Sequence, residues 1–199
     1  CHAKYAIGCG NGTDALTIAL KSLNLPKDSE VIIPAMTYCS TAFAVINANL
    51  KPILVDIDSM KPTISVEKIK SKINPKTKVI IPVHLYGRIC QMDAILRIAE
   101  KHFLYVIEDT AQAFGAEQDG RNAGMMGDVG CFSFYKTKNI STFEGGMVCI
   151  PKHSTLNHKK IRSICDQGQV GKYNHKYIGF NFRLAEPLCL MALEVPFCF

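Results

Sequence analysis

Two lysines follow an apolar segment in the second half of the chain, and lysine is a residue that can do covalent chemistry. The segment reads SFYKTKN over residues 133–139, with the lysines at Lys136 and Lys138. In a closed site a lysine amine can lose its proton and attack a carbonyl carbon to form a Schiff base. Taken alone, the stretch is more simply interpreted as two solvent-exposed lysines.

A second chemical feature is the pair of acids Glu108 and Asp109 at the end of an apolar run. A carboxylate at the end of a buried strand must meet a positive partner or stay in contact with water. The nitrogen of a pyridine ring would serve, because the ion pair keeps the ring protonated and makes it an electron acceptor. A helix cap or a surface turn would explain these acids equally well.

Glycines at positions 8, 10 and 12 precede a helical pattern that starts at Thr13. Glycines let the backbone approach an anion, and the first N–H groups of a helix bind phosphate. The spacing matches neither the dinucleotide-binding fingerprint nor the P-loop. By itself the motif therefore indicates a simple turn and helix start as readily as an anion site.

The elements that must position these residues alternate along the chain, which is typical of a mainly parallel α/β sheet. We expect helices at residues 13–25, 41–48, 65–73 and 93–101, and strands at residues 30–34, 52–55, 78–83, 104–108, 129–134 and 147–150. In such sheets, ligands bind beyond the carboxyl ends of the strands. The glycine-rich segment and the polar residues at 37–38, 84–87, 109–112 and from 133 onward all fall at those ends, which is the first indication of a binding site.

Composition and charge argue against several classes of protein. Hydrophobic residues make up 48% and charged residues 20% of the 199 residues, as in soluble globular proteins, and no apolar run reaches the roughly 18 residues of a membrane helix. The nine cysteines are scattered without a C-x-x-C pair, so we expect no metal site and reduced thiols in a cytoplasmic protein. The basic stretch at 152–176 is either a surface loop or a site for an anionic ligand, and it lacks the density of a nucleic-acid surface.

Seven short motifs occur in a fixed order, and together they resemble the DegT/DnrJ/EryC1/StrS family of nucleotide-sugar aminotransferases. They are GTDAL at 12–16, VHLYG at 83–87, MDAI at 92–95, VIEDTAQA at 106–113, GDVGCFSF at 127–134, TKN at 137–139 and EGGM at 144–147. The resemblance covers residues 3–185. It implies the large domain of a fold type I (aspartate aminotransferase-like) enzyme, a three-layer α/β/α structure with a mostly parallel sheet that binds pyridoxal 5'-phosphate (PLP).

The resemblance also implies a role for each matching residue. Lys138 would carry PLP as a Schiff base, with Lys136 a bystander, and Asp109 would pair with the pyridine nitrogen. The other implied cofactor contacts are Tyr38 stacked on the ring, Gln112 beside the ring hydroxyl, Gly12, Thr13, Asp14 and Ser133 around the phosphate, and Asn181 reaching the phosphate in a neighbouring subunit.

The reaction that the resemblance implies is transamination of a nucleotide-diphosphate keto sugar, with L-glutamate as the amino donor, to give an amino sugar for glycan or polysaccharide biosynthesis. Lys138 would move a proton as general acid and base, and the active site would be shared across a homodimer. The residues do not identify the sugar, although EGGM at 144–147 slightly favours amination at C4 over C3.

The match ends after Glu186. We therefore expect a PLP-binding large domain at 1–186, incomplete at its N-terminus, and an atypical tail at 187–199, with Pro187 where the family's next helix should start and with the C-terminal small domain absent. The alternative function is a truncated, non-catalytic fragment that keeps the fold or binds a partner subunit. A PLP sugar dehydratase of the same family carries His in place of Lys138, and a nicotinamide-dependent oxidoreductase would need the missing fingerprint.

Overall fold

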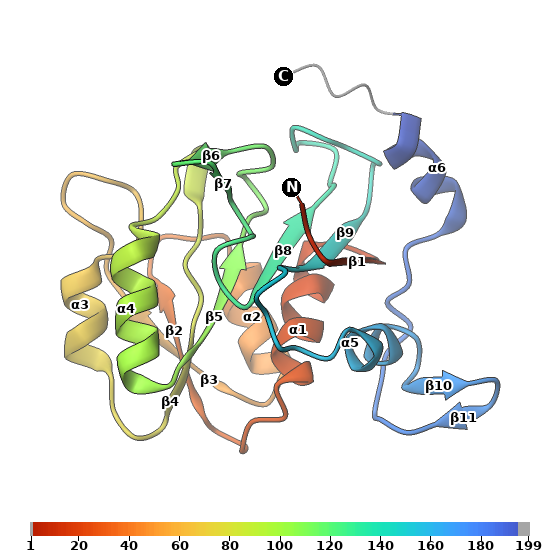
Figure 1. The fold of residues 1–199 in the computed structure, drawn as a ribbon, viewed down its shortest axis with the longest axis horizontal. Coiled ribbons are helices and arrows are strands. Elements are labelled where there is room, and N and C mark those ends of the chain that lie inside the picture. Colours follow the sequence, from red (N-terminus) through yellow and green to blue (C-terminus); the bar gives the residue numbers. More distant parts are fainter. Residues whose placement is uncertain (1, 195–199) are drawn as a thin grey trace.

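The computed structural model describes residues 2–194, and a seven-stranded sheet forms its centre (Figure 1). Its strands are β1 (Tyr5–Cys9), β2 (Glu30–Pro34), β3 (Lys51–Val55), β4 (Thr77–Ile80), β5 (Tyr105–Asp109), β8 (Val129–Ser133) and β9 (Gly146–Ile150). They lie in the order β1-β9-β8-β5-β4-β2-β3. Pairing is parallel from β3 to β8, and β9 runs antiparallel to both of its neighbours. The prediction of a mostly parallel sheet is confirmed.

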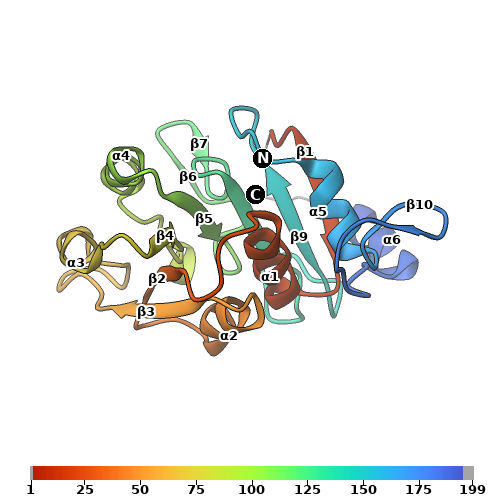
Figure 2. The ribbon, with the colours of Figure 1, turned by 90° about the horizontal axis from the view of Figure 1, so that it is seen from below.

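Helices cover both faces of this sheet and complete three layers (Figure 2). One apolar core lies under α1 (Gly12–Ser22), α2 (Cys39–Asn47) and α5 (His158–Cys165), and a second lies under α3 (Val66–Lys72) and α4 (Met92–His102). Strand β2 shows why both faces are covered: Val31 and Ile33 belong to the first core and Ile32 to the second. Because successive side chains point to opposite faces, a strand covered on both sides is apolar at consecutive positions, as β2 is from Val31 to Ile33.

Local sequence signals fix most of these elements to within a few residues. Ser65 caps α3 as expected, since its Oγ accepts a hydrogen bond from the N–H of Lys68 at 3.4 Å. The strand expected at 78–83 ends at Ile80, because Pro82 has no N–H to continue the ladder. Beyond the proline, Val83 makes only an isolated bridge to Asp109.

The interpretation of residues 152–176 as a surface loop is wrong in part, because α5 lies within that stretch. The side chain of Asn157 caps its first turn, and Ile161, Ile164 and Cys165 are buried against α1 and the sheet. The charged residues of α5 form its outer face. One of them, Lys160, reaches across and donates to the carbonyl oxygen of Ser22 at 2.7 Å.

The remaining elements lie outside the central sheet. They are the two-stranded hairpins β6 (Glu117–Gln118) with β7 (Arg121–Asn122) and β10 (Gln169–Gly171) with β11 (Asn174–His175), the 3-10 helix η1 (Leu85–Gly87), and α6 (Glu186–Glu194). Helix α6 has no buried residue and stands away from the sheet (Figure 1). Pro187 lies in its first turn, where a missing N–H costs no intrahelical hydrogen bond. The expected tail at 187–199 is described only as far as Glu194. Within residues 2–194 no helix has the length and apolarity needed to cross a membrane.

Candidate active site

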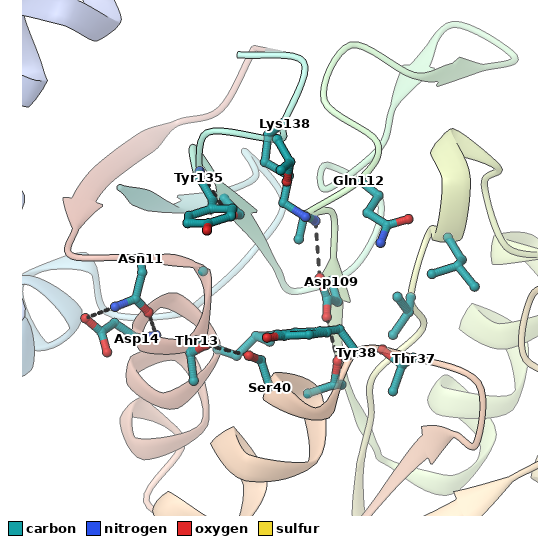
Figure 3. Close-up of a pocket in the computed structure, with 18 of the residues that line it drawn as sticks. Asn11, Thr13, Asp14, Thr37, Tyr38, Ser40, Asp109, Gln112, Tyr135 and Lys138 are labelled. Carbon is teal, nitrogen blue, oxygen red and sulfur yellow. Dashed lines mark hydrogen bonds between the residues drawn. The ribbon is translucent and has the colours of Figure 1, made fainter. Parts of the chain in front are cut away.

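A cavity of about 650 Å³ opens at the carboxyl edge of the sheet, in the segments that follow β1, β2, β4, β5 and β8 (Figure 3). The structure brings together there the predicted site residues Gly12, Thr13, Asp14, Tyr38, Asp109, Gln112, Ser133 and Lys138. Asn181 does not line this cavity. It is exposed and makes an isolated backbone bridge to Asp166, so its predicted role in a neighbouring subunit stays a prediction.

The carboxylate of Asp109 forms the floor of the cavity and is only 5% exposed. Its Oδ2 accepts a hydrogen bond from Thr41 Oγ1 at 2.9 Å, and its Oδ1 accepts one from the N–H of Ala111 at 3.2 Å. Burial raises the pKa of Asp109 above its usual value, and the two hydrogen bonds and the charges of His84 and Lys138 oppose that rise only in part. The site therefore favours a further cationic donor beside this carboxylate.

Lys138 reaches the cavity from the segment between β8 and β9. Backbone hydrogen bonds between residues 134 and 145, 136 and 143, and 134 and 142 hold this segment as a continuation of the two strands. The side chain of Lys138 points into the cavity toward Asp109 (Figure 3). Lys136 does not line the cavity, and its amine instead lies 5.8 Å from the ring centre of Tyr135. Of the two lysines that the sequence offers, the structure brings Lys138 to the buried acid.

Tyr38 provides an aromatic face at the mouth of the cavity. It is the N-cap residue of α2, and it is 71% exposed, so its ring is available for stacking on a planar ligand. On another wall, Gln112 accepts a hydrogen bond through Oε1 from the N–H of Tyr86 at 2.9 Å. Its Nε2 group is thereby left as a donor on the cavity side (Figure 3).

The N-terminus of α1 forms the other end of the cavity and has the features of an anion site. The N–H groups of Gly12 and Thr13 stand in the first turn, where no preceding helical carbonyl can accept their hydrogen bonds. Thr13 Oγ1 donates to Ser40 Oγ at 2.8 Å, and Ser133 lies beside them. A side chain at Gly12 would place its Cβ 2.9 Å from the Cβ of Ser133, so glycine lets α1 begin this close to β8.

Asp14 lines the cavity, but its polar groups are already engaged by the N-cap residue Asn11. The N–H of Asp14 donates to Asn11 Oδ1 at 2.9 Å, and Asp14 Oδ2 accepts from Asn11 Nδ2 at 3.1 Å. Burial raises the pKa of the Asp14 carboxyl to about 6. The anion site therefore depends on Gly12, Thr13 and the neighbouring hydroxyls, and a direct role for Asp14 stays a prediction.

Sequence reasoning missed the hydroxyl residues that follow Tyr38, namely Ser40 and Thr41, which bind Thr13 and Asp109. The available signal was a pair of hydroxyls in a first helical turn, directly after a strand's carboxyl end. Glu108 points away from the cavity and has a structural role. Its fully buried carboxylate accepts hydrogen bonds from His84 Nε2 and from three backbone N–H groups at residues 124, 126 and 127.

Comparison with known proteins agrees with this geometry. The model of the DegT/DnrJ/EryC1/StrS aminotransferase family matches residues 1–195. A UDP-N-acetyl-3-dehydro-alpha-D-glucosamine 3-aminotransferase of Acidithiobacillus ferrooxidans is 41% identical over 182 residues, which are 92% of this chain and 49% of that protein. The chain spans about half the length of the curated relatives it matches.

Solved structures show the same relationship. DesV of S. venezuelae, determined in complex with a ketimine intermediate, superimposes with a TM-score of 0.91 at 35% identity, covering 97% of this chain and 52% of DesV. The PLP form of the sugar aminotransferase Spr1654 of Streptococcus pneumoniae, itself described as putative, has a TM-score of 0.91 at 25% identity, covering 96% of this chain and 54% of that one. The predicted fold class is thereby confirmed.

Proposed function

Since this chain belongs to the DegT/DnrJ/EryC1/StrS aminotransferase family, we propose that its cavity binds PLP and serves the transamination of a nucleotide-linked keto sugar. One observation carries the proposal: the amine of Lys138 faces the buried carboxylate of Asp109 across a cavity with an exposed aromatic ring, Tyr38, at its mouth. The solved structures of similar chains hold such chemistry, one with a ketimine intermediate and one in a PLP form.

The charges of the cavity fit PLP at both ends. Asp109 is a desolvated carboxylate that needs a cationic donor, and a protonated pyridine nitrogen is one. At the opposite end, the first turn of α1 and the hydroxyls of Thr13, Ser40 and Ser133 suit a phosphate. A cavity of about 650 Å³ also lies within the usual size range of cofactor sites.

The residues that line the cavity would then each have a role in binding the cofactor or in the reaction. Asp109 would hold the ring nitrogen, Tyr38 would stack on the ring, and Gln112 would donate from Nε2 to the ring oxygen. When bound, PLP supplies an aldehyde that a lysine amine can hold and a protonated ring that accepts electrons from the substrate. Lys138 Nζ would hold the cofactor and, once released, move the proton at the substrate's α-carbon. Burial of Asp109 keeps water from competing for its oxygens.

The substrates and partners extend this proposal. We propose L-glutamate as the amino donor and a nucleotide-diphosphate keto sugar as the acceptor, because the curated relatives include nucleotide-sugar aminotransferases. We also propose a homodimer with shared sites. In its support, Phe43 and Ile46 are each 54% exposed on α2, the helix whose first turn lines the cavity, and exposed apolar side chains of this kind are typical of subunit contacts. Asn181 would reach the partner's site.

We further propose that residues 1–186 form the PLP-binding large domain and that the chain acts in the cytoplasm. The first point is supported by α6, which has no buried residue after Glu186. The second is supported by the cysteines of the described residues, all of which are free.

Covalent trapping tests the central claim. The purified chain is incubated with PLP, reduced with borohydride, digested and mapped by mass spectrometry. We expect the added mass on Lys138, retention of the label in Lys136→Arg, and its loss in Lys138→Arg. A label on another lysine, or none on a folded chain, would refute the proposal.

A second measurement separates the enzyme from a chain that only binds the cofactor. Glutamate is added to the PLP-loaded protein, and release of 2-oxoglutarate is followed. Release supports transamination. An adduct at Lys138 without release would instead support the alternative function of a non-catalytic chain.

A further inference from the structure

Thr41 is the residue that joins α2 to the buried acid, although no motif singles it out. Its side chain is 1% exposed, and its Oγ1 donates to Asp109 Oδ2 at 2.9 Å across 68 positions of sequence. Thr41 Oγ1 also lies 2.8 Å from Thr37 Oγ1. A hydroxyl has one proton, and that of Thr41 goes to Asp109, so the proton between the two threonines comes from Thr37. The hydrogen bonds therefore run in one direction, from Thr37 through Thr41 to Asp109.

The same helical turn carries two other contacts with the cavity. Tyr38 is the N-cap of α2, and Ser40 accepts the hydrogen bond of Thr13 at the start of α1. Within residues 2–194, Thr41 is the only side chain that donates a hydrogen bond to Asp109, since the other donor is the backbone N–H of Ala111. This turn of α2 therefore supplies the side-chain hydrogen bond that orients the carboxylate relative to the cavity, beside the backbone bond from Ala111.

The charged and titratable groups around Asp109 come from three other elements. His84 faces it from the segment after β4, Lys138 from the segment after β8, and Cys131 from β8 itself. Glu108 precedes it on β5 but is occupied by its own four donors. None of these groups replaces the short, neutral, directional hydrogen bond from Thr41.

We propose that Thr41, oriented by Thr37, is a positioning residue for the reaction: its hydroxyl holds the Asp109 carboxylate as an anion directed at the cavity, and the site thereby selects a ligand with a cationic ring N–H. Naming PLP as that ligand rests on the proposed function, whereas the effect of Thr41 on Asp109 does not. The hydrogen bond lowers the pKa of Asp109 against the rise caused by burial. A hydrogen bond to a charged group corresponds to about tenfold to a hundredfold in an equilibrium constant.

The first test needs no cofactor. The carboxyl carbon of Asp109 is titrated by NMR in the full chain, in the wild type and in Thr41→Val, Thr41→Ser and Thr37→Val. Losing the donor destabilises the anion, so we expect Thr41→Val to raise the midpoint by about one pH unit or more, as the tenfold effect requires. Thr37→Val should raise it less, and Thr41→Ser should restore the wild-type midpoint. The same midpoint in Thr41→Val, or in Thr37→Val if the first variant does not fold, would overturn the proposal.

The second test asks whether the effect acts through the ring nitrogen. Binding of PLP and of an analogue with carbon in place of that nitrogen is measured by absorbance titration. We expect Thr41→Val to weaken PLP binding about tenfold and analogue binding by less than twofold. Equal losses for both ligands would mean that Thr41 only shapes the cavity, which contradicts the proposal.

A matched control comes from α1. Thr17 is 2% exposed, and its hydroxyl donates to the carbonyl oxygen of Thr13 at 2.9 Å rather than to Asp109. Thr17→Val also removes a buried hydroxyl, so it should leave the Asp109 midpoint and the ratio of the two affinities unchanged. If the wild type binds no PLP at Lys138, the proposed function fails, and the NMR titration still decides the role of Thr41.

Discussion

Replacing Glu108 with glutamine is expected to destabilise the fold severely, even though the two side chains have nearly the same shape. Glu108 Oε1 accepts from the N–H groups of Met126 and Gly127 at 2.8 and 2.6 Å, and Oε2 accepts from His84 Nε2 and the N–H of Gly124 at 2.8 and 2.9 Å. All four contacts are donors, and the side chain is fully buried. In either orientation of the amide, its NH₂ group would face two donors.

The size of the stability loss follows from the two hydrogen bonds that are lost where the NH₂ group replaces a carboxylate oxygen. A hydrogen bond to a charged acceptor contributes about 1.5–3 kcal/mol, so two of them amount to about 3–6 kcal/mol. Relief from burying a charge offsets part of this, and we expect a loss of about 3–5 kcal/mol in the free energy of unfolding. For a chain of this length the midpoint of thermal unfolding should fall by about 6–20 °C.

Urea denaturation followed by circular dichroism measures this loss, provided that the slope with denaturant is unchanged. Glu117→Gln, at an exposed position on β6, is the matched control and should stay within about 0.5 kcal/mol of the wild type. A loss below about 1 kcal/mol for Glu108→Gln would show that the four donors do not depend on the charge of this acid, and the reasoning would be refuted.

Three further predictions concern the cavity and its surroundings. Gly12→Ala should weaken phosphate and PLP binding at least tenfold in a titration, because its Cβ would lie 2.9 Å from that of Ser133; unchanged affinity would contradict the anion site. Asp14 has its pKa raised to about 6 in the fold, so it favours folding below the pKa of the unfolded chain and loses that contribution as the pH rises through about 6. Asp14→Asn should therefore gain stability relative to the wild type between pH 4 and pH 7 in urea denaturation, and a loss over that range would refute the assignment. Phe43→Asp should shift the protein toward monomer in sedimentation velocity while changing monomer stability by less than about 1 kcal/mol, and an unaltered assembly would remove α2 from the proposed dimer contact.

The fold was largely predictable because its central strands are apolar on both faces and its helices carry local caps. Strand β1 was not predicted, since five residues that include a glycine give little local signal, and its pairing with β9 joins positions about 140 residues apart. Helix α5 was not predicted, because the charged residues of its outer face made the stretch look like a surface loop. The order of strands also could not be derived locally, because it depends on contacts between distant segments.

The candidate site was likewise predictable only in part. Lys138 and Asp109 are named by motifs whose order resembles a family, and the structure brings them to one cavity. The hydroxyl partners of Asp109 and Thr13 were not predicted, because the hydroxyls at positions 40 and 41 gain a role only when α2 packs beside α1 and β5. The engagement of the Asp14 N–H by Asn11 likewise depends on side-chain geometry that spacing alone does not determine.

Helix α2 is only nine residues long, yet its inner side reaches the ligand cavity and its outer side is exposed to solvent. A helix this short moves as one rigid unit. A molecule that binds its exposed side and shifts it must therefore alter the affinity of the cavity for its ligand. Thermodynamic reciprocity then requires the ligand to alter the affinity of α2 for that molecule by the same factor. Ligand binding in the cavity and association of chains through the exposed side of α2 would thus be coupled.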